Sequence, residues 1–433
     1  MKKVKREIER RNGEVHKFYE GSVGEIIRRA RIELNLTQET VAKGICSNTY
    51  ISKLENNQII ANRYCLGLIM ERVKVPYSVI DLPKQMISDL TKALQYYIRH
   101  DVEQYKELVE CHAKYDFGVI IQIIRFGYAI LSEEIEVATQ MNRELYHYFS
   151  SMDDYAFSVF LLFSVDFHHL NQDYKEAKFI LDLSQNFHHL GKLMVSYMHY
   201  QHFLNYGFLH EFATSTKHQT VARGHFILEE NTYRIHHMDM MAVLFGIYES
   251  GRLNHTISPS IIEMFPKRER DMYYMMIAQF SDNLERDLAM IDDESHLKDE
   301  KHYLQCKALY QQKRMEEYQV AKGVFLASQK NTVHNPDYYQ LLILQEENRL
   351  QEEKELLLDE FIPQALMTQN IWKIQKLFRR VSQISFETKR YKDAAMYLTM
   401  INSEIESIRT IKKTDPEGPV EFTPQVESHY ALD

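Results

Sequence analysis

Apolar residues recur at three- and four-residue spacing along most of the 433-residue chain, which is the pattern of amphipathic helices. Between residues 84 and 413 we find no convincing alternation of apolar and polar positions of the kind that marks a half-buried strand. The low numbers of Gly (14) and Pro (9) also favour long helices. We therefore predict an all-α protein.

Between residues 22 and 75 the pattern breaks into four short helices with recognisable start and stop signals. A Ser-x-x-Glu capping box occupies residues 22–25, and Thr37 is a suitable N-cap for the second helix. Gly44 lies near the end of that helix, where a residue in the left-handed conformation is needed. Ser47 or Asn48 can cap the third helix. Two short helices joined by a tight turn predict a helix-turn-helix domain over residues 21–80.

The same stretch resembles a known family. Leu-Thr-Gln-Glu at 36–39, Gly-Ile-Cys-Ser at 44–47 and Tyr-Ile-Ser-Lys-Leu-Glu-Asn at 50–56 are similar to the Xre/Cro-type domain. The last two segments more narrowly resemble the RRNPP peptide-pheromone regulators of Gram-positive bacteria (Rgg, Rap, NprR, PlcR and PrgX). Two positions depart from the pattern, with Asn57 in place of the usual Gly and Ala61 in place of the usual Pro, which leaves the turn buildable but less rigid.

The resemblance implies a set of DNA contacts. The side chain of Gln38 would bond a backbone phosphate, and the third helix would face the major groove with Ser47, Asn48, Thr49, Tyr50 and Lys53. The chemistry agrees, because Asn bonds adenine, Thr and Tyr touch a thymine methyl, and Lys suits phosphate or guanine. We expect Ser52 and Glu55 to be structural. The alternative is a solvated polar helix face. One such domain makes too few contacts for tight binding, so we expect a homodimer on operator DNA.

A weak repeat runs through residues 84–413. Asn-Gln-Asp-Tyr-Lys-Glu-Ala at 171–177 and Thr-Lys-Arg-Tyr-Lys-Asp-Ala at 388–394 share a turn, an aromatic residue and a small Ala, like the start of a second helix in a tetratricopeptide (TPR) repeat. Looser copies begin at Val102, Ile135 and Met315, and fainter ones at Phe212, Leu253 and Leu284. We predict about eight helix pairs in a TPR-like right-handed α-solenoid. A non-repeating helical bundle is the alternative.

The concave face of such a solenoid accommodates extended peptides or partner helices. The RRNPP resemblance implies that a short signalling peptide binds there and changes the DNA-bound state of the dimer. Polar residues on the predicted first helices are candidate peptide contacts, each with an ordinary capping or surface role as the alternative: Arg125, Tyr128, His202, Asn205 and Arg234.

Charged residues are distributed unevenly along the chain. Residues 1–75 hold 15 Lys and Arg against 9 Asp and Glu, whereas the whole chain has a net charge of −9. Basic N-terminal residues followed by an acidic remainder suggest that the N-terminal part binds a polyanion. The alternative is that the surface charge is distributed in this way by chance. The four cysteines are scattered without paired spacing, which favours a reducing environment such as the cytoplasm. No apolar run is long enough to span a membrane, so we expect a cytoplasmic protein.

We find no catalytic, nucleotide-binding, metal or cofactor motif in the sequence. Phe-His-His-Leu occurs at 167–170 and 187–190, where helices are expected to end. Histidine at these positions complements the helix dipole, and we prefer this interpretation to a metal site. We expect no enzyme activity and no cofactor. The rival functions are a regulator whose solenoid binds another protein, a Rap-like adaptor or phosphatase, and an enzyme with a hidden helical site.

Both ends of the chain are harder to interpret. Residues 1–20 are polar and charged, which favours either a basic arm on DNA or a loose extension. Residues 414–433 hold three of the nine prolines and favour a disordered tail. A further possibility is that this tail occupies the groove as a self-peptide.

Overall fold

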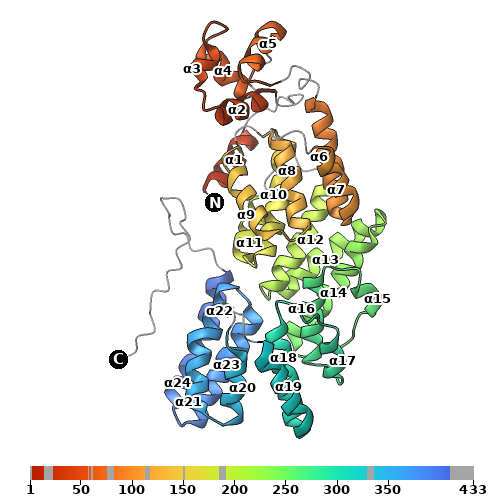
Figure 1. Ribbon diagram of the computed structural model, residues 1–433, viewed down its shortest axis with the longest axis vertical. Coiled ribbons are helices and arrows are strands. Elements are labelled where there is room, and N and C mark those ends of the chain that lie inside the picture. Colours follow the sequence, from red (N-terminus) through yellow and green to blue (C-terminus); the bar gives the residue numbers. More distant parts are fainter. Residues whose placement is uncertain are drawn as a thin grey trace.

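The computed structural model describes residues 2–13, 23–56, 58–59, 62–75, 82–112, 118–149, 152–184, 192–328 and 336–409. All regular elements in these ranges are helices, as the hydrophobic pattern predicts. Figure 1 shows the helix-turn-helix domain at one end of the long axis and the last helices of the body at the other. Ser22, Asn57, Ala61, the second Phe-His-His-Leu and the tail lie outside the described residues.

The helix-turn-helix domain consists of α2 (Val23–Glu33), α3 (Gln38–Ala42), α4 (Asn48–Glu55) and α5 (Arg63–Arg72). These four helices share a small apolar core that includes Ile27, Val41, Ile51 and Ile69, each fully buried. Gly44 has a φ of 75°, which glycine adopts at little cost, so the chain can reverse between α3 and α4.

The body is a succession of helices in which most elements pack on their sequence neighbours. The longer elements are α6 (Leu82–Arg99), α7 (Val102–Cys111), α8 (Val119–Leu131), α9 (Ile135–Leu145), α10 (Asp154–Leu170), α11 (Tyr174–Ser184), α12 (Lys192–Phe208), α13 (Phe212–Leu228), α14 (Thr232–Ser250), α16 (Lys267–Ala278), α18 (Lys298–Gln311), α19 (Met315–Ser328), α23 (Ile371–Glu387) and α24 (Tyr391–Arg409). Shorter ones are α15 (Pro259–Ile262), α17 (Leu284–Ala289), α20 (Tyr338–Glu346), α21 (Leu350–Leu356), a π-helical turn (Leu357–Phe361) and α22 (Ile362–Met367).

The turns inside the helix pairs repeat one local design. In six of them, a residue with positive φ stands two positions before the second helix: His100, Glu133, Gln172, His210, Lys313 and Lys389. The following backbone N–H bonds a carbonyl five residues back, as Asp101 does to Tyr96 at 2.8 Å, which is the Schellman arrangement. Second helices therefore begin at the positions that the weak sequence repeat predicts, including Val102, Ile135, Tyr174 and Tyr391.

One predicted repeat start is wrong. Leu253 begins no helix, because Gly251 ends α14 in the left-handed conformation with a φ of 66°. The chain then runs without helix as far as Pro259, which occupies the first position of the short α15. The apolar spacing around Leu253 mimicked a helix start, but the glycine on one side and the proline on the other leave no room for one.

The first residues also differ from the expected loose extension or free basic arm. Residues Lys2–Gly13 form α1, whose Val4 and Ile8 are buried in the core of the body. The guanidinium of Arg11, 3% exposed, donates to the Asp154 carboxylate at 2.6 Å and to the carbonyls of Phe149 and Met152 at 2.7 Å. Buried apolar residues at four-residue spacing and a satisfied buried arginine hold this helix on the body.

Two apolar cores make up the body. One runs from α1 and α6 to α17, and the other is formed mainly by α18 to α24. Within the described residues, no helix combines the length and the apolar character needed to cross a membrane.

Close packing in the first core predicts a sharp contrast between two glycines. A Cβ built on Gly207 would lie 2.1 Å from the Phe245 ring, whereas a Cβ on Gly224 would meet nothing within 4 Å. We expect Gly207→Ala to lower the free energy of unfolding by about 1–3 kcal/mol through overpacking. Gly224→Ala should raise it by about 0.5–1 kcal/mol, because alanine is the better helix former. Urea unfolding of both variants tests this, and equal effects would contradict the packing described here.

Candidate DNA-binding surface and internal cavity

The helix α4 is held at both its start and its end. The Ser47 hydroxyl accepts a hydrogen bond from the Tyr50 backbone N–H at 3.1 Å, and Thr37 caps α3 through Thr40 in the same way. At the other end, Glu55 is 1% exposed and receives two hydrogen bonds from Arg31, at 2.6 and 2.9 Å. These contacts fix α4 against α2 and α3, so its outward face is presented rigidly.

Glu55 also accepts a hydrogen bond from the Gln38 side-chain amide at 2.7 Å. One buried carboxylate thus joins three helices, through Arg31 on α2, Gln38 on α3 and its own position on α4. This supports the structural role expected for Glu55. Gln38 is half-buried and already has this protein partner, and its contact to a DNA phosphate stays a prediction.

The predicted recognition residues differ in their exposure and in the contacts they already make. Asn48, Thr49 and Lys53 are exposed on one helix and have the donors, acceptors and methyl groups that read base edges. Tyr50 is half-buried, and its hydroxyl accepts a hydrogen bond from the Asn62 backbone N–H at 3.1 Å. Tyr50 therefore also ties α4 to the start of α5. The remaining member, Ser47, is exposed but is used as the N-cap.

Three of the five predicted peptide contacts are buried. His202, Asn205 and Arg234 are at most 6% exposed and lie between helices. The Asn205 side-chain oxygen faces His169 Nε2 at 3.1 Å, and the His202 ring stacks on that of His218 with centroids 4.5 Å apart. Assignment of these three residues to an open groove is therefore corrected, because polar positions on the first helices face the helix interfaces.

The buried side chain of Arg234 makes several hydrogen bonds within the body. Its guanidinium donates to the carbonyls of Ile98 and Tyr97 at 2.8 and 3.0 Å and to the Tyr200 hydroxyl at 2.9 Å. It thereby caps the C-terminal end of α6 from within α14. Arg125 and Tyr128 are half-buried on α8, and Arg125 Nη2 donates to the His112 carbonyl at 3.4 Å.

The structure instead contains a cavity of about 900 Å³ where the two cores of the body meet. Apolar and aromatic side chains form much of its wall, among them Phe208, Tyr248, Met272, Phe361 and Trp372. Its size and mixed lining are those of small-molecule and peptide pockets. None of the five residues predicted from the sequence lines it.

The end of the chain returns to the middle of the body beside the cavity. The Gln369 side-chain amide donates to Asp173 at 3.1 Å, and the Lys175 ammonium donates to the Ser407 carbonyl at 3.2 Å. Arg409, the last described residue, donates to the carbonyls of Leu209 and His210 at 2.9 and 3.0 Å. These pairs join residues between 196 and 232 positions apart, and no local pattern in the sequence predicts them.

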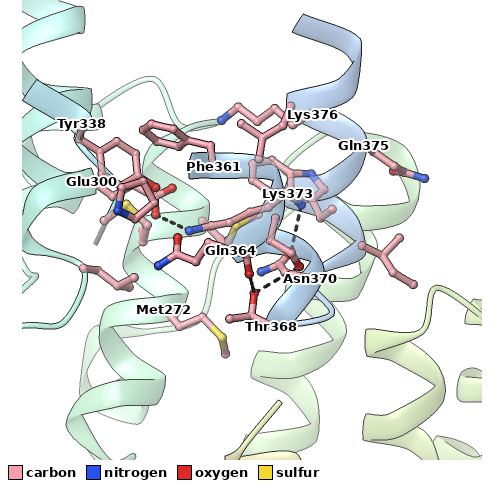
Figure 2. A pocket seen from close by; sticks show the side chains of 18 of the residues that line it. Met272, Glu300, Tyr338, Phe361, Gln364, Thr368, Asn370, Lys373, Gln375 and Lys376 are labelled. Carbon is pink, nitrogen blue, oxygen red and sulfur yellow. Dashed lines mark hydrogen bonds and ion pairs between the residues drawn. The ribbon is translucent and has the colours of Figure 1, made fainter. Parts of the chain in front are cut away.

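The charged residues of the cavity wall are predominantly cationic. Two acidic residues line it, Asp299 and Glu300, against six basic ones: Arg268, Lys307, Lys373, Lys376, Arg379 and Arg380. Figure 2 shows Lys373 and Lys376 extending from α23 on the same side, with Lys373 reaching Glu300 at 2.6 Å. Burial alone would lower the pKa of Lys373, but the Glu300 carboxylate outweighs it and the pKa is raised.

Lys376 and Lys307 lack such a carboxylate. The Lys376 ammonium donates to the Gln279 side-chain oxygen at 2.6 Å and lies 4.7 Å from the Trp372 ring centroid. Although the side chain of Lys376 is accessible to solvent, dehydration by the surrounding protein, together with the charges of Lys307 and Lys373, outweighs the opposing charge of Glu300 and lowers its pKa to about 8. Burial and the Arg380 charge also lower the pKa of Lys307. The charged residues of the cavity wall thus carry an excess of positive charge, and neither Lys307 nor Lys376 has a carboxylate in ion-pair distance among the described residues.

Comparison with known proteins supports the first of these two sites. Residues 27–63 match the helix-turn-helix family model, which confirms the N-terminal part of the sequence-based expectation. No curated protein matches the chain. Among solved structures, the apo form of the quorum sensor NprR from Bacillus thuringiensis is 13% identical, with 75% of this chain and 99% of that one covered and a TM-score of 0.49.

A second solved structure is Bacillus thuringiensis PlcR in complex with the peptide PapR7 and DNA. It is 11% identical, with 90% of this chain and 100% of that one covered and a TM-score of 0.16. Neither structural likeness is close enough to carry an argument about this chain.

Proposed function

We propose that the protein is a DNA-binding transcriptional regulator whose helical body binds a short signalling peptide in the internal cavity. The observation that carries the DNA-binding half is the exposed face of α4, with Asn48, Thr49 and Lys53, inside a segment that matches a helix-turn-helix family. Because one such helix contacts few bases, the regulator acts as a homodimer on paired half-sites.

The peptide half of the proposal is supported by the cavity. Its volume of about 900 Å³, its aromatic wall and its row of polar groups suit a short extended chain. The side-chain amide of Gln364 and the cationic groups on α23 supply donors for peptide carbonyl and carboxylate oxygens. The resemblance of residues 36–56 to the peptide-pheromone regulators favours the same use.

A cavity-filling substitution tests this assignment. Met272 points into the cavity, so Met272→Trp should occupy the space a peptide needs. We expect this variant to lose at least about 10-fold in sensitivity to peptides, because a blocked pocket forfeits about 1.4 kcal/mol or more of binding free energy. Its peptide-free DNA binding should be unchanged. Met264→Trp is the matched control, because Met264 is 47% exposed and does not line the cavity.

A single selection experiment tests both DNA binding and the response to peptides. Fragments of the sheared source genome are selected on the purified protein at fixed near-physiological salt, with and without small peptides from spent medium. Enrichment of a few palindromic sites that changes with the peptides, and that ceases to change in Met272→Trp, is the expected result. Enrichment indifferent to the peptides would favour the alternative regulator whose body binds a protein partner. No enrichment would contradict DNA recognition by α4.

A further inference from the structure

Part of the positive charge on the cavity wall is not paired with a carboxylate among the described residues. Of the six basic residues, Lys373 is paired with Glu300 and Arg380 with Glu353, each through a hydrogen bond of 2.7 Å or less. Lys307 and Lys376 face aromatic rings and neutral oxygens instead, with no carboxylate in ion-pair distance among the described residues. Two ammonium groups in a partly dehydrated cavity repel each other, so binding of an anion between them would be favourable.

An acidic segment follows, in the sequence, a helix end that contacts the cavity wall. Helix α24 ends at Arg409, whose guanidinium bonds the carbonyl of His210, a residue of the cavity wall. Residues 414–433 then contain five carboxylates and no Lys or Arg: Asp415, Glu417, Glu421, Glu427 and Asp433. The chain advances by up to about 3.3–3.6 Å per residue, so the first acidic residues are within reach of a cavity that adjoins Arg409.

We propose that residues 414–433 bind in the cavity in cis and place carboxylate groups against Lys307 and Lys376, as an internal competitor of the signalling peptide. The regulatory consequence rests on the proposed function, whereas the binding of the segment does not. A tethered ligand of this kind acts at an effective concentration on the order of millimolar. An external peptide must displace it, so the segment sets the peptide concentration at which the regulator responds.

The test uses a protein that ends at residue 413 and the full chain, with a fluorescein-labelled synthetic peptide of residues 414–433 as the probe. We expect the shortened protein to bind the probe with an affinity that falls steeply with salt, and the full chain to bind it at least 10-fold more weakly. In the shortened protein, Lys307→Met with Lys376→Met should weaken binding of the probe at least 10-fold. Lys392→Met is the matched control, because Lys392 is exposed on α24 away from the cavity wall.

A second variant avoids any change to the body. In the full chain, replacing the five acidic residues of 414–433 by Asn or Gln should let the labelled native probe bind as it does to the shortened protein. Thermal unfolding of each variant shows whether the body is intact. The proposal is overturned if the shortened protein does not bind the probe, if the full chain binds it equally well, or if a probe with all five acids amidated binds as tightly. Loss of the genomic peptide response, by contrast, would contradict the proposed function and leave this measurement unaffected.

Discussion

Simultaneous replacement of Asn48 and Lys53 by alanine should lower the affinity of the protein for its selected genomic fragments by at least about 30-fold. Each good contact to a base edge contributes about 1–3 kcal/mol of discrimination, and a factor of ten corresponds to about 1.4 kcal/mol. Both side chains are exposed on α4, so their removal leaves the core of the domain intact. Anisotropy of labelled fragments at fixed salt measures the effect.

Lys74→Ala is the control for the loss of one positive charge. Lys74 is exposed in the same domain but follows α5 rather than lying on α4. We expect it to change the affinity only slightly, through the general electrostatic term. Tyr50 is a poorer test of recognition, because its hydroxyl bonds the Asn62 backbone and its removal would also loosen the link to α5. If the Asn48 and Lys53 variant binds DNA normally, α4 is not the recognition helix.

The second large effect is expected at Glu55. Glu55→Ala leaves the Arg31 guanidinium, which is largely buried, without its partner and also removes the acceptor of Gln38. Breaking a buried ion pair from one side costs about 3–5 kcal/mol, which is a large fraction of the stability of a small domain. We expect α2, α3 and α4 to lose most of their protection against hydrogen exchange while the body keeps its own, and DNA binding to be lost with them.

Two comparisons sharpen this prediction. Glu55→Gln keeps acceptor and shape and should fall between the wild type and alanine. Glu33→Ala removes a more exposed carboxylate that pairs with Arg29 on the same helix, and exposed pairs contribute about 1 kcal/mol or less. Equal protection in Glu55→Ala and Glu33→Ala would show that the carboxylate of Glu55 does not hold the three helices together.

The local parts of this molecule could be predicted from the sequence because they depend on neighbours within a few residues. The caps at Thr37 and Ser47, the left-handed Gly44 and the second-helix starts at Val102 and Tyr174 all follow from hydrogen bonds closed within one turn of chain. The same holds for the helical class of the body, since apolar spacing alone indicates which face of a helix is buried. The helix start predicted at Leu253 is wrong, because Gly251 and Pro259 override the apolar spacing there.

Only the tertiary structure decided where the candidate ligand site lies. A polar residue on an amphipathic helix, such as Asn205 or Arg234, can face a groove or bond a neighbouring helix, and both choices have the same spacing. The docking of α1 through Arg11 depends on carbonyls 138 and 141 residues away. The cavity likewise lies beside the contacts of Arg409 with Leu209 and His210, which are 200 and 199 residues away, and contacts at that separation leave no periodic pattern in the sequence.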